Sequence, residues 1–180
     1  YCVYIGYGAG NFATTANDNV GIGLEAGRGA SSGNGPTGTH NVYVGSGAAE
    51  DVTGATNCTA IGADALTTNT ASGNTAVGNE ALKLNTTGAG NIAVGKNALL
   101  SNTTGNYNIS VGQNSLDANT TASNNTAIGH EALTENTTGE RNTAVGSLSA
   151  DANTTGNYNT ALGYNALSAN TTASYNTALG

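Results

Sequence analysis

The side chains that could do acid–base or nucleophilic chemistry are few in this chain of 180 residues. It has two histidines, His40 and His130, and two cysteines, Cys2 and Cys58. Catalysis by such groups needs a partner within hydrogen-bond reach. No Ser/His/Asp or Cys/His set can be recognised around any of the four. The sequence therefore predicts no catalytic residue, and it favours surface positions for both histidines.

Three further patterns could indicate ligand sites. The segments Gly6-Tyr7-Gly8 and Gly21-Ile22-Gly23 look like fragments of a phosphate-binding loop, but no predicted helix follows either one. The G-G-x-G-x-D calcium repeat is absent from the sequence. Asp64, Glu80 and Glu131 share one position of the repeat described below, where they could form a weak cation ledge, although solvated charges are the expected interpretation. We predict no metal site and no cofactor.

Composition excludes several classes of function. The net charge is −7, with four basic residues against eleven acidic ones, so the chain lacks the basic face that a nucleic-acid backbone requires. No apolar stretch approaches the roughly 20 residues of a membrane span, and we expect no membrane insertion of this segment. Aromatic residues make up 5% of the chain, and Met and Trp are absent. An ordinary globular core cannot be built from such residues, which leaves a repetitive β architecture.

A repeat of 17 residues runs through the chain. The unit that opens at Asn91 reads N-I-A-V-G-K-N-A-L-L-S-N-T-T-G-N-Y, and similar units recur every 17 residues from Asn74 to Asn176. The N-terminal third is more degenerate and contains one unit of 22 residues and one of 16. The extra residues fall within 29–40, which we predict to be an inserted loop. Both ends cut through a unit, so residues 1–180 are interpreted as one segment of a longer repeat protein.

Alternation at the start of each unit indicates a short strand. We number repeat positions from the opening Asn or Cys. Position two is β-branched and position four is aliphatic, while position three is small in most units. This period of two is typical of a strand. We predict that positions two and four point into the core and that position three faces outward. The predicted core ladder is Ile5, Ile22, Val44, Ile61, Val77, Val94, Val111, Ile128, Val145, Leu162 and Leu179.

The opening residue is Asn in nine units. Stacked coils would place these side chains above one another, where they could form an amide ladder along the molecule. The predicted Asn ladder is Asn19, Asn41, Asn74, Asn91, Asn108, Asn125, Asn142, Asn159 and Asn176. Cys2 and Cys58 replace Asn in the two remaining units. They stand three coils apart, about 14 Å at the usual strand spacing, which is too far for a disulfide within one chain.

The rest of the unit predicts bends and turns. Position five is always Gly, which indicates a bend or a backbone angle that other residues avoid. Positions eight and nine read Ala-Leu in the regular units, and we predict a second short strand whose Leu fills the core. Positions twelve to fifteen read N-T-T-G or N-T-T-A, typical of a tight turn. Each unit is therefore one coil of an all-β parallel β-solenoid of about eleven coils.

Two sets of turn residues are candidates for function. The N-T-T sequons are formal N-glycosylation acceptors, although Asn and Thr also suit the turn and a ladder without modification. These possible glycosylation sites are Asn85, Asn102, Asn119, Asn136, Asn153 and Asn170. Tyr107, Tyr158 and Tyr175 share position seventeen, where they either pack across subunits or offer an exposed aromatic edge to sugars or a host surface.

A coil of this size is thin, because it has only about three modest apolar side chains. Solenoids usually bury more in each turn. We expect the additional burial to come from neighbouring copies of the chain, packed along the rod against the small residues of position three. The sequence thus predicts a homo-oligomer.

The unit N-T-A-[VIL]-G-x-x-[AS]-L resembles the head repeats of trimeric autotransporter adhesins. It is also similar to repeats of phage tail fibres and of bacterial surface proteins that end in an endosialidase-type intramolecular chaperone. The resemblance covers nearly the whole chain and is weakest at residues 29–40. It implies a left-handed parallel β-roll, association as a homotrimer, and a role in adhesion or as a fibre shaft. The unit here is longer by the N-T-T-G segment, so a more protruding turn is expected.

The leading functional hypothesis is a non-enzymatic structural or adhesive fibre segment, extracellular, on a cell surface or a virion tail. Its partners would be copies of itself and a host-surface or glycan receptor. A self-assembling, possibly glycosylated extracellular filament is the first alternative. An ice-binding solenoid is less favoured, because the position-two threonines are predicted to point inward. An enzymatic shaft of the tailspike kind is the most distant alternative, since no acidic pair stands out from the repeat.

Overall fold

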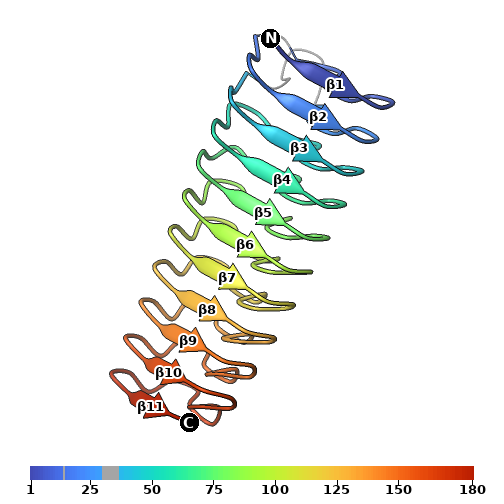
Figure 1. Cartoon of the computed structure of the whole chain (residues 1–180). Coiled ribbons are helices and arrows are strands. Elements are labelled where there is room, and N and C mark those ends of the chain that lie inside the picture. The colour runs from blue at the N-terminus through green and yellow to red at the C-terminus, as the bar shows by residue number, and fades with distance from the viewer. Residues whose placement is uncertain (14, 30–36) are drawn as a thin grey trace.

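The computed structural model describes residues 1–13, 15–29 and 37–180. These residues form an all-β parallel solenoid with one three-residue strand in each coil and no helix (Figure 1). The strands are β1 (Val3–Ile5), β2 (Val20–Ile22), β3 (Val42–Val44), β4 (Thr59–Ile61), β5 (Thr75–Val77), β6 (Ile92–Val94), β7 (Ile109–Val111), β8 (Thr126–Ile128), β9 (Thr143–Val145), β10 (Thr160–Leu162) and β11 (Thr177–Leu179). They make one eleven-stranded sheet in sequence order, and we number the coils 1 to 11 after them.

The register of the sheet follows the repeat at every step. Position two pairs with position two even across the 16-residue unit, where Thr59 lies opposite Thr75. The same holds across the 22-residue unit, where Val20 lies opposite Val42. The additional residues are therefore accommodated outside the strands. Most of the predicted loop at 29–40 lies outside the described residues, because only Gly29 and residues 37–40 of it are described.

The side chains of the strands point to the opposite sides from those predicted. Position three lies inside the coil, and its alanines Ala60, Ala76 and Ala93 have no exposed surface. Positions two and four point outward, so that Ile92 and Val94 keep 39% and 36% of their surface exposed. The predicted core ladder is thus wrong. Its members are all exposed or half-buried: Ile5, Ile22, Val44, Ile61, Val77, Val94, Val111, Ile128, Val145, Leu162 and Leu179.

The reason for this reversal is the narrow interior of the coil. It holds small residues at positions three and eight, a leucine at position nine, and two asparagines at positions one and twelve. Two columns of β-branched side chains would not fit beside them at the packing density of a protein core. Leu82, Leu99 and Leu133 are fully buried, which confirms that the leucine of position nine fills the core.

The second strand predicted at positions eight and nine is not formed in the described coils. Position nine has a left-handed backbone, with φ of 51° at Leu82 and 52° at Leu99, and position seven does too, with φ of 59° at Glu80. Residues in this conformation make consecutive turns instead of a strand. Hydrogen bonds between coils nevertheless continue here, as the Leu99 N–H donates to the Ser115 carbonyl oxygen at 3.1 Å. The coils are therefore tied together on the turn side as well as in the sheet.

Position five requires glycine for two reasons. Its φ is 137° at both Gly45 and Gly95, a conformation that other residues rarely adopt. A Cβ atom on Gly45 would also lie 2.5 Å from the carbonyl oxygen of Gly62 in the next coil. The predicted bend is confirmed, and it is the point at which the chain leaves the sheet.

The N-terminal coils fill their interior differently. Tyr43 takes position three and is fully buried, and Tyr4 takes the same position in coil 1. A Cβ atom on Gly27 would lie 2.7 Å from the Tyr43 ring, and one on Gly10 would lie 2.6 Å from the Tyr4 ring. Both glycines stand at position nine, where the regular coils have leucine. A tyrosine ring therefore occupies the volume that leucine fills elsewhere.

Candidate functional site

The outer face of the sheet, which we define as the side chains of positions two and four, has a position-four column that is aliphatic throughout and a position-two column of valine, isoleucine and threonine. It extends along all eleven strands, because these pair in register and in sequence order. In the middle of the sheet Ile109 and Ile128 are 37% and 40% exposed. Parallel pairing spaces like positions by about 4.8 Å, so the face consists of two straight columns. A contiguous exposed apolar patch of this kind marks an interaction surface.

The position-six edge borders this face on the side where the strands end. Its residues follow the glycine bend and are exposed in nearly every coil. Tyr7 and Tyr164 stand here with 83% and 71% of their surface exposed, and Leu24 with 50%. The role of these residues as a border could be recognised only once the outward direction of positions two and four was known.

The position-seventeen edge borders the face where the strands begin, and it carries the tyrosines selected from the sequence. The Tyr158 and Tyr175 rings are stacked, with centroids 5.0 Å apart and planes 3° from parallel. The Arg141 guanidinium lies 5.3 Å from the Tyr158 ring centroid, and its Nη1 donates to the Tyr158 hydroxyl at 2.6 Å. Arg141, Tyr158 and Tyr175 thus form a stack along the rod, while Tyr107 stands apart from it.

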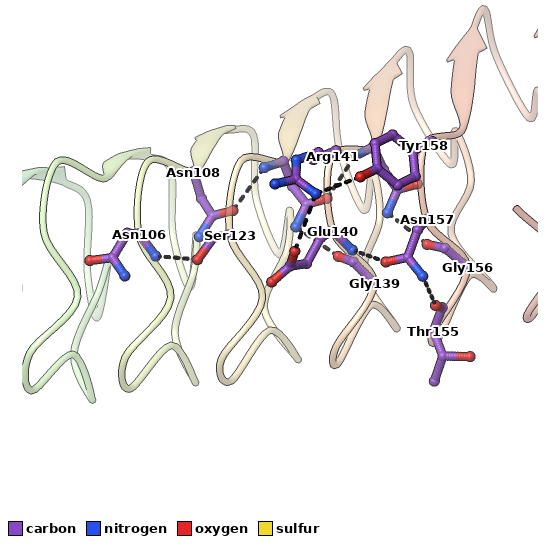
Figure 2. A network of polar contacts seen from close by, with 12 residues as sticks. Asn106, Asn108, Ser123, Gly139, Glu140, Arg141, Thr155, Gly156, Asn157 and Tyr158 are labelled. Carbon is purple, nitrogen blue, oxygen red and sulfur yellow. Dashed lines mark hydrogen bonds and ion pairs between the residues drawn. The ribbon is translucent and has the colours of Figure 1, made fainter. Parts of the chain in front are cut away.

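A row of polar contacts beneath this stack fixes its position (Figure 2). The Glu140 N–H donates to Asn157 Oδ1 at 2.7 Å, and Asn157 Nδ2 donates to the Thr155 carbonyl oxygen at 3.1 Å. Two coils earlier, the Asn106 N–H donates to Ser123 Oγ at 3.0 Å. Position sixteen therefore links successive coils at the corner from which the tyrosines project.

The asparagines of position one lie in a buried column, but their links run from side chain to backbone. The Asn108 N–H donates to Asn91 Oδ1 at 2.9 Å, and Asn91 Nδ2 donates to the Gly105 carbonyl oxygen at 2.8 Å. The same pattern recurs at the neighbouring coils. Each opening asparagine thus joins its coil to the next and also closes the turn of its own coil.

The sequon asparagines of position twelve form a second buried ladder, which does run from amide to amide. Asn102 Nδ2 donates to Asn85 Oδ1 at 2.8 Å and to the Gly105 carbonyl oxygen at 3.0 Å. A glycan on this nitrogen would replace both contacts and would need space that the coil lacks. The prediction of glycosylation acceptors is therefore wrong for the folded coils. Five members of the set have no exposed surface, namely Asn85, Asn102, Asn119, Asn136 and Asn153, and Asn170 in the last full coil is half-buried.

The acidic residues of position seven do not form an open cation ledge. Lys83 Nζ lies 3.1 Å from Asp64 Oδ2 and 2.7 Å from Glu80 Oε1, and these two contacts raise the pKa of the lysine. Glu131 lies near His130, with 3.6 Å between Oε1 and Nε2. Across the described coils, no three His, Cys, Asp or Glu side chains gather as metal ligands would.

A second group of charges joins coils 2 and 3. Arg28 lies 2.9 Å from Glu25, 2.7 Å from Glu50 and 3.1 Å from Asp51. Burial lowers the pKa of Arg28, but the hydrogen bond with Asp51 and the charges of Glu50 and Glu25 outweigh it, so the pKa is raised overall. Burial also raises the pKa of Glu50. The cluster is internally paired, and its role is to tie neighbouring coils together.

The histidines and cysteines are not brought together. His40 Nδ1 lies 3.0 Å from Thr39 Oγ1, and His130 is at the position-six edge of coil 8. Both cysteines are free thiols, Cys2 exposed and Cys58 buried. Burial raises the pKa of the Cys58 thiol, which keeps it protonated and unreactive. None of these four residues lies in an arrangement suited to nucleophilic chemistry.

No helix in the described ranges has the length and hydropathy that a membrane crossing needs. Comparisons of the chain with protein-family models, with curated proteins and with solved structures find no match.

Proposed function

We propose that this chain is a non-enzymatic rod segment of an extracellular fibre or adhesive head, in which copies of the chain associate through the outer face. The observation that carries this proposal is the outward-facing aliphatic column of position four, which runs along all eleven strands beside a column of valine, isoleucine and threonine. The largest exposed apolar patch of a soluble protein is often its functional surface. The surface differs from the one expected from the sequence, since the alanines are inside and the aliphatic side chains are outside.

The shape of the face supports self-association in particular. Its two columns are straight and periodic, so a second copy of the same face can match it along its whole length. No charged residue stands at position two or four of the eleven strands, and the ion pairs of Arg28 and Lys83 lie outside these positions. The number of subunits and the hand of the coil follow from the resemblance to adhesin head repeats, which implies a left-handed roll and a homotrimer.

In this assembly the turns remain outside and would meet a receptor. The second threonine of the N-T-T turn is exposed in every regular coil, as at Thr104 and Thr121. The function proposed for these turns is contact with a host surface or a glycan, at a cell surface or on a virion tail. The rod itself would act as a rigid support for this contact.

Sedimentation equilibrium tests the association. The expected mass is three times that of the chain. Ile92→Lys would place a charge on the outer face and should yield a folded monomer, because a desolvated lysine opposite an apolar surface is strongly unfavourable. Thr104→Lys adds the same charge on an exposed turn and should remain trimeric. A wild-type chain that sediments as a monomer at all concentrations would contradict the proposal.

Ice binding is a second candidate, because one observation now favours it. The threonines of position two, such as Thr126, Thr143 and Thr160, lie on the outer face and not inside the coil. The argument against ice binding taken from the sequence therefore fails. Both functions need the same face, so a trimer would hide it. Thermal hysteresis in a solution of monomeric chain would favour ice binding over the fibre.

A further inference from the structure

The outer face alone is too small for a stable interface. A three-residue strand is about 10 Å long, and ten strand spacings of about 4.8 Å make the face about 48 Å tall, roughly 480 Å² in all. Specific complexes usually bury about 800 Å² on each partner. Including the two edges widens the surface to seven residues, or about 23 Å, and roughly doubles its area. If the proposed association is correct, the position-six and position-seventeen edges must take part in it.

Tyrosine at position six occurs only in coils that also have tyrosine before the strand, although coil 7 has Tyr107 before its strand and Gln113 at position six. Position six is aromatic in two coils only, at Tyr7 and Tyr164. In both coils the residue before the strand, at position seventeen, is also tyrosine, namely Tyr1 and Tyr158. The two edges lie at opposite ends of the strand, six residues apart, which a fully extended chain would span in about 20 Å. Tyr158 and Tyr164 of one chain are therefore separated by the full width of the sheet.

Parallel association brings these separated positions together. When rods related by a rotation about an axis parallel to their length pack face to face, the position-six edge of one meets the position-seventeen edge of the next at the same height. An antiparallel pair would instead bring like edges together and reverse the order of the coils. A correlation within single coils thus indicates a parallel assembly without stagger.

We propose that Tyr164 of one subunit packs against the Arg141–Tyr158 stack of the neighbouring subunit at the same level of the rod. This inference rests on the proposed self-association and adds its direction, its register and a specific contact. Tyr164 is 71% exposed in the single chain, so it has a large surface to bury. The Tyr158 hydroxyl is already held by Arg141 at 2.6 Å, which fixes the ring before association.

Chemical cross-linking tests the contact. In a Cys2→Ser background the remaining thiol, Cys58, is buried. The double variant Tyr158→Cys/Tyr164→Cys, treated with a short bis-maleimide, should give covalent species up to three chains on a denaturing gel. Either single variant should stay at one chain, because like edges are far apart in a parallel ring. A covalent limit of two chains would support the edge contact but contradict the trimer.

A matched control changes only the levels along the rod at which the two cysteines stand. Tyr158→Cys/Gln113→Cys pairs the same edges three coils, or about 14 Å, apart, and should not cross-link. Each variant is first sedimented. A wild-type monomer would overturn both the association and the contact. An assembled double variant that does not cross-link would overturn only the edge contact, as would equal cross-linking of the control.

Fluorescence gives an independent measurement on assembled protein. The chain has no tryptophan, so Tyr164→Trp introduces a single indole. We expect its emission to be blue-shifted and protected from acrylamide in the assembly. Adding Tyr158→Ala should increase quenching of that indole while the sedimentation coefficient stays unchanged. Since the two positions lie at opposite ends of the strand in one chain, unchanged quenching would contradict a contact between subunits.

Discussion

Replacing Gly95 with alanine tests whether the glycines of position five are required by both backbone angle and close stacking. The φ of Gly95 is 137°. A Cβ atom there would lie 2.5 Å from the carbonyl oxygen of Gly112 and 2.6 Å from its carbon. That carbonyl group cannot move away freely, because the Gly112 N–H donates to the Val94 oxygen at 2.8 Å. The alanine can therefore be accommodated only by separating two coils.

The expected cost has two parts. Holding a residue other than glycine in this region of backbone space costs about 1–3 kcal/mol. Weakening one hydrogen bond between coils adds about 0.5–1.5 kcal/mol. Together they predict a loss of about 2–4 kcal/mol, a large fraction of the 5–15 kcal/mol by which domains are usually stable.

Urea unfolding followed by circular dichroism measures this loss. Protein concentration must be held constant, since association contributes to apparent stability. Gly73→Asn is the matched control. Gly73 also has a positive φ, 76°, but a Cβ atom there would meet nothing closer than 3.9 Å. Asn124 occupies the same repeat position in another coil with φ of 62°. The control should change stability by no more than about 0.5 kcal/mol, and an equal effect of both substitutions would refute the reasoning.

Three further variants test buried and half-buried groups, the first two by the same urea unfolding assay and the third by thermal melting. Leu99→Ala removes a fully buried leucine and should cost about 2–5 kcal/mol; a loss below 1 kcal/mol would mean that the interior collapses around the gap. Ser110 and Ser115 hydrogen-bond to each other inside coil 7, so changing both to alanine should alter stability by less than about 1 kcal/mol, because neither leaves a partner unpaired. Burial raises the pKa of Asp117, although Thr134 donates a hydrogen bond to it at 2.8 Å. Since a raised folded-state pKa makes the ionised form destabilising, Asp117→Asn should raise the melting temperature at neutral pH, and this advantage should vanish at about pH 3. A gain that persists in acid would exclude this explanation.

The period of the sequence is enough to predict much of the architecture. Opening residues 17 positions apart imply one coil per unit and a parallel sheet in register, and the pairing of Thr75 with Ile92 agrees with this. The register survives the units of irregular length because their extra or missing residues fall in the turns. The glycine bend could likewise be predicted, since a residue fixed at one phase of a repeat indicates a fixed backbone requirement.

Which face of the strand points into the coil could not be predicted by the same reasoning. Alternation defines two faces of a strand, and a shift of one residue exchanges them. In a wide core the larger apolar residues are inside. In this narrow coil the interior is shared with leucine and two asparagines, so that only a residue as small as Ala76 fits at position three.

One signal in the sequence does indicate that position three points into the coil. The units with tyrosine at position three, Tyr4 and Tyr43, have Gly10 and Ala49 at position nine in place of leucine. A large residue at one position and a small one at another imply that the two share one volume. Position nine was correctly predicted to be inside, so position three had to be inside too.

The buried asparagines explain why position three points into the coil and the aliphatic side chains point outward. Turning the strand over would move Asn91 out of the interior and leave the buried N–H of Asn108 without its acceptor, while the carbonyl oxygen of Gly105 would keep only the hydrogen bond from Asn102. Each orphaned buried group costs about 1–3 kcal/mol, and the loss would be repeated in every coil. The polar residues thus decide which face is inside. The side chains of positions two and four do not have to hold the coil together, so they stay on the outer face, where the proposed association would use them.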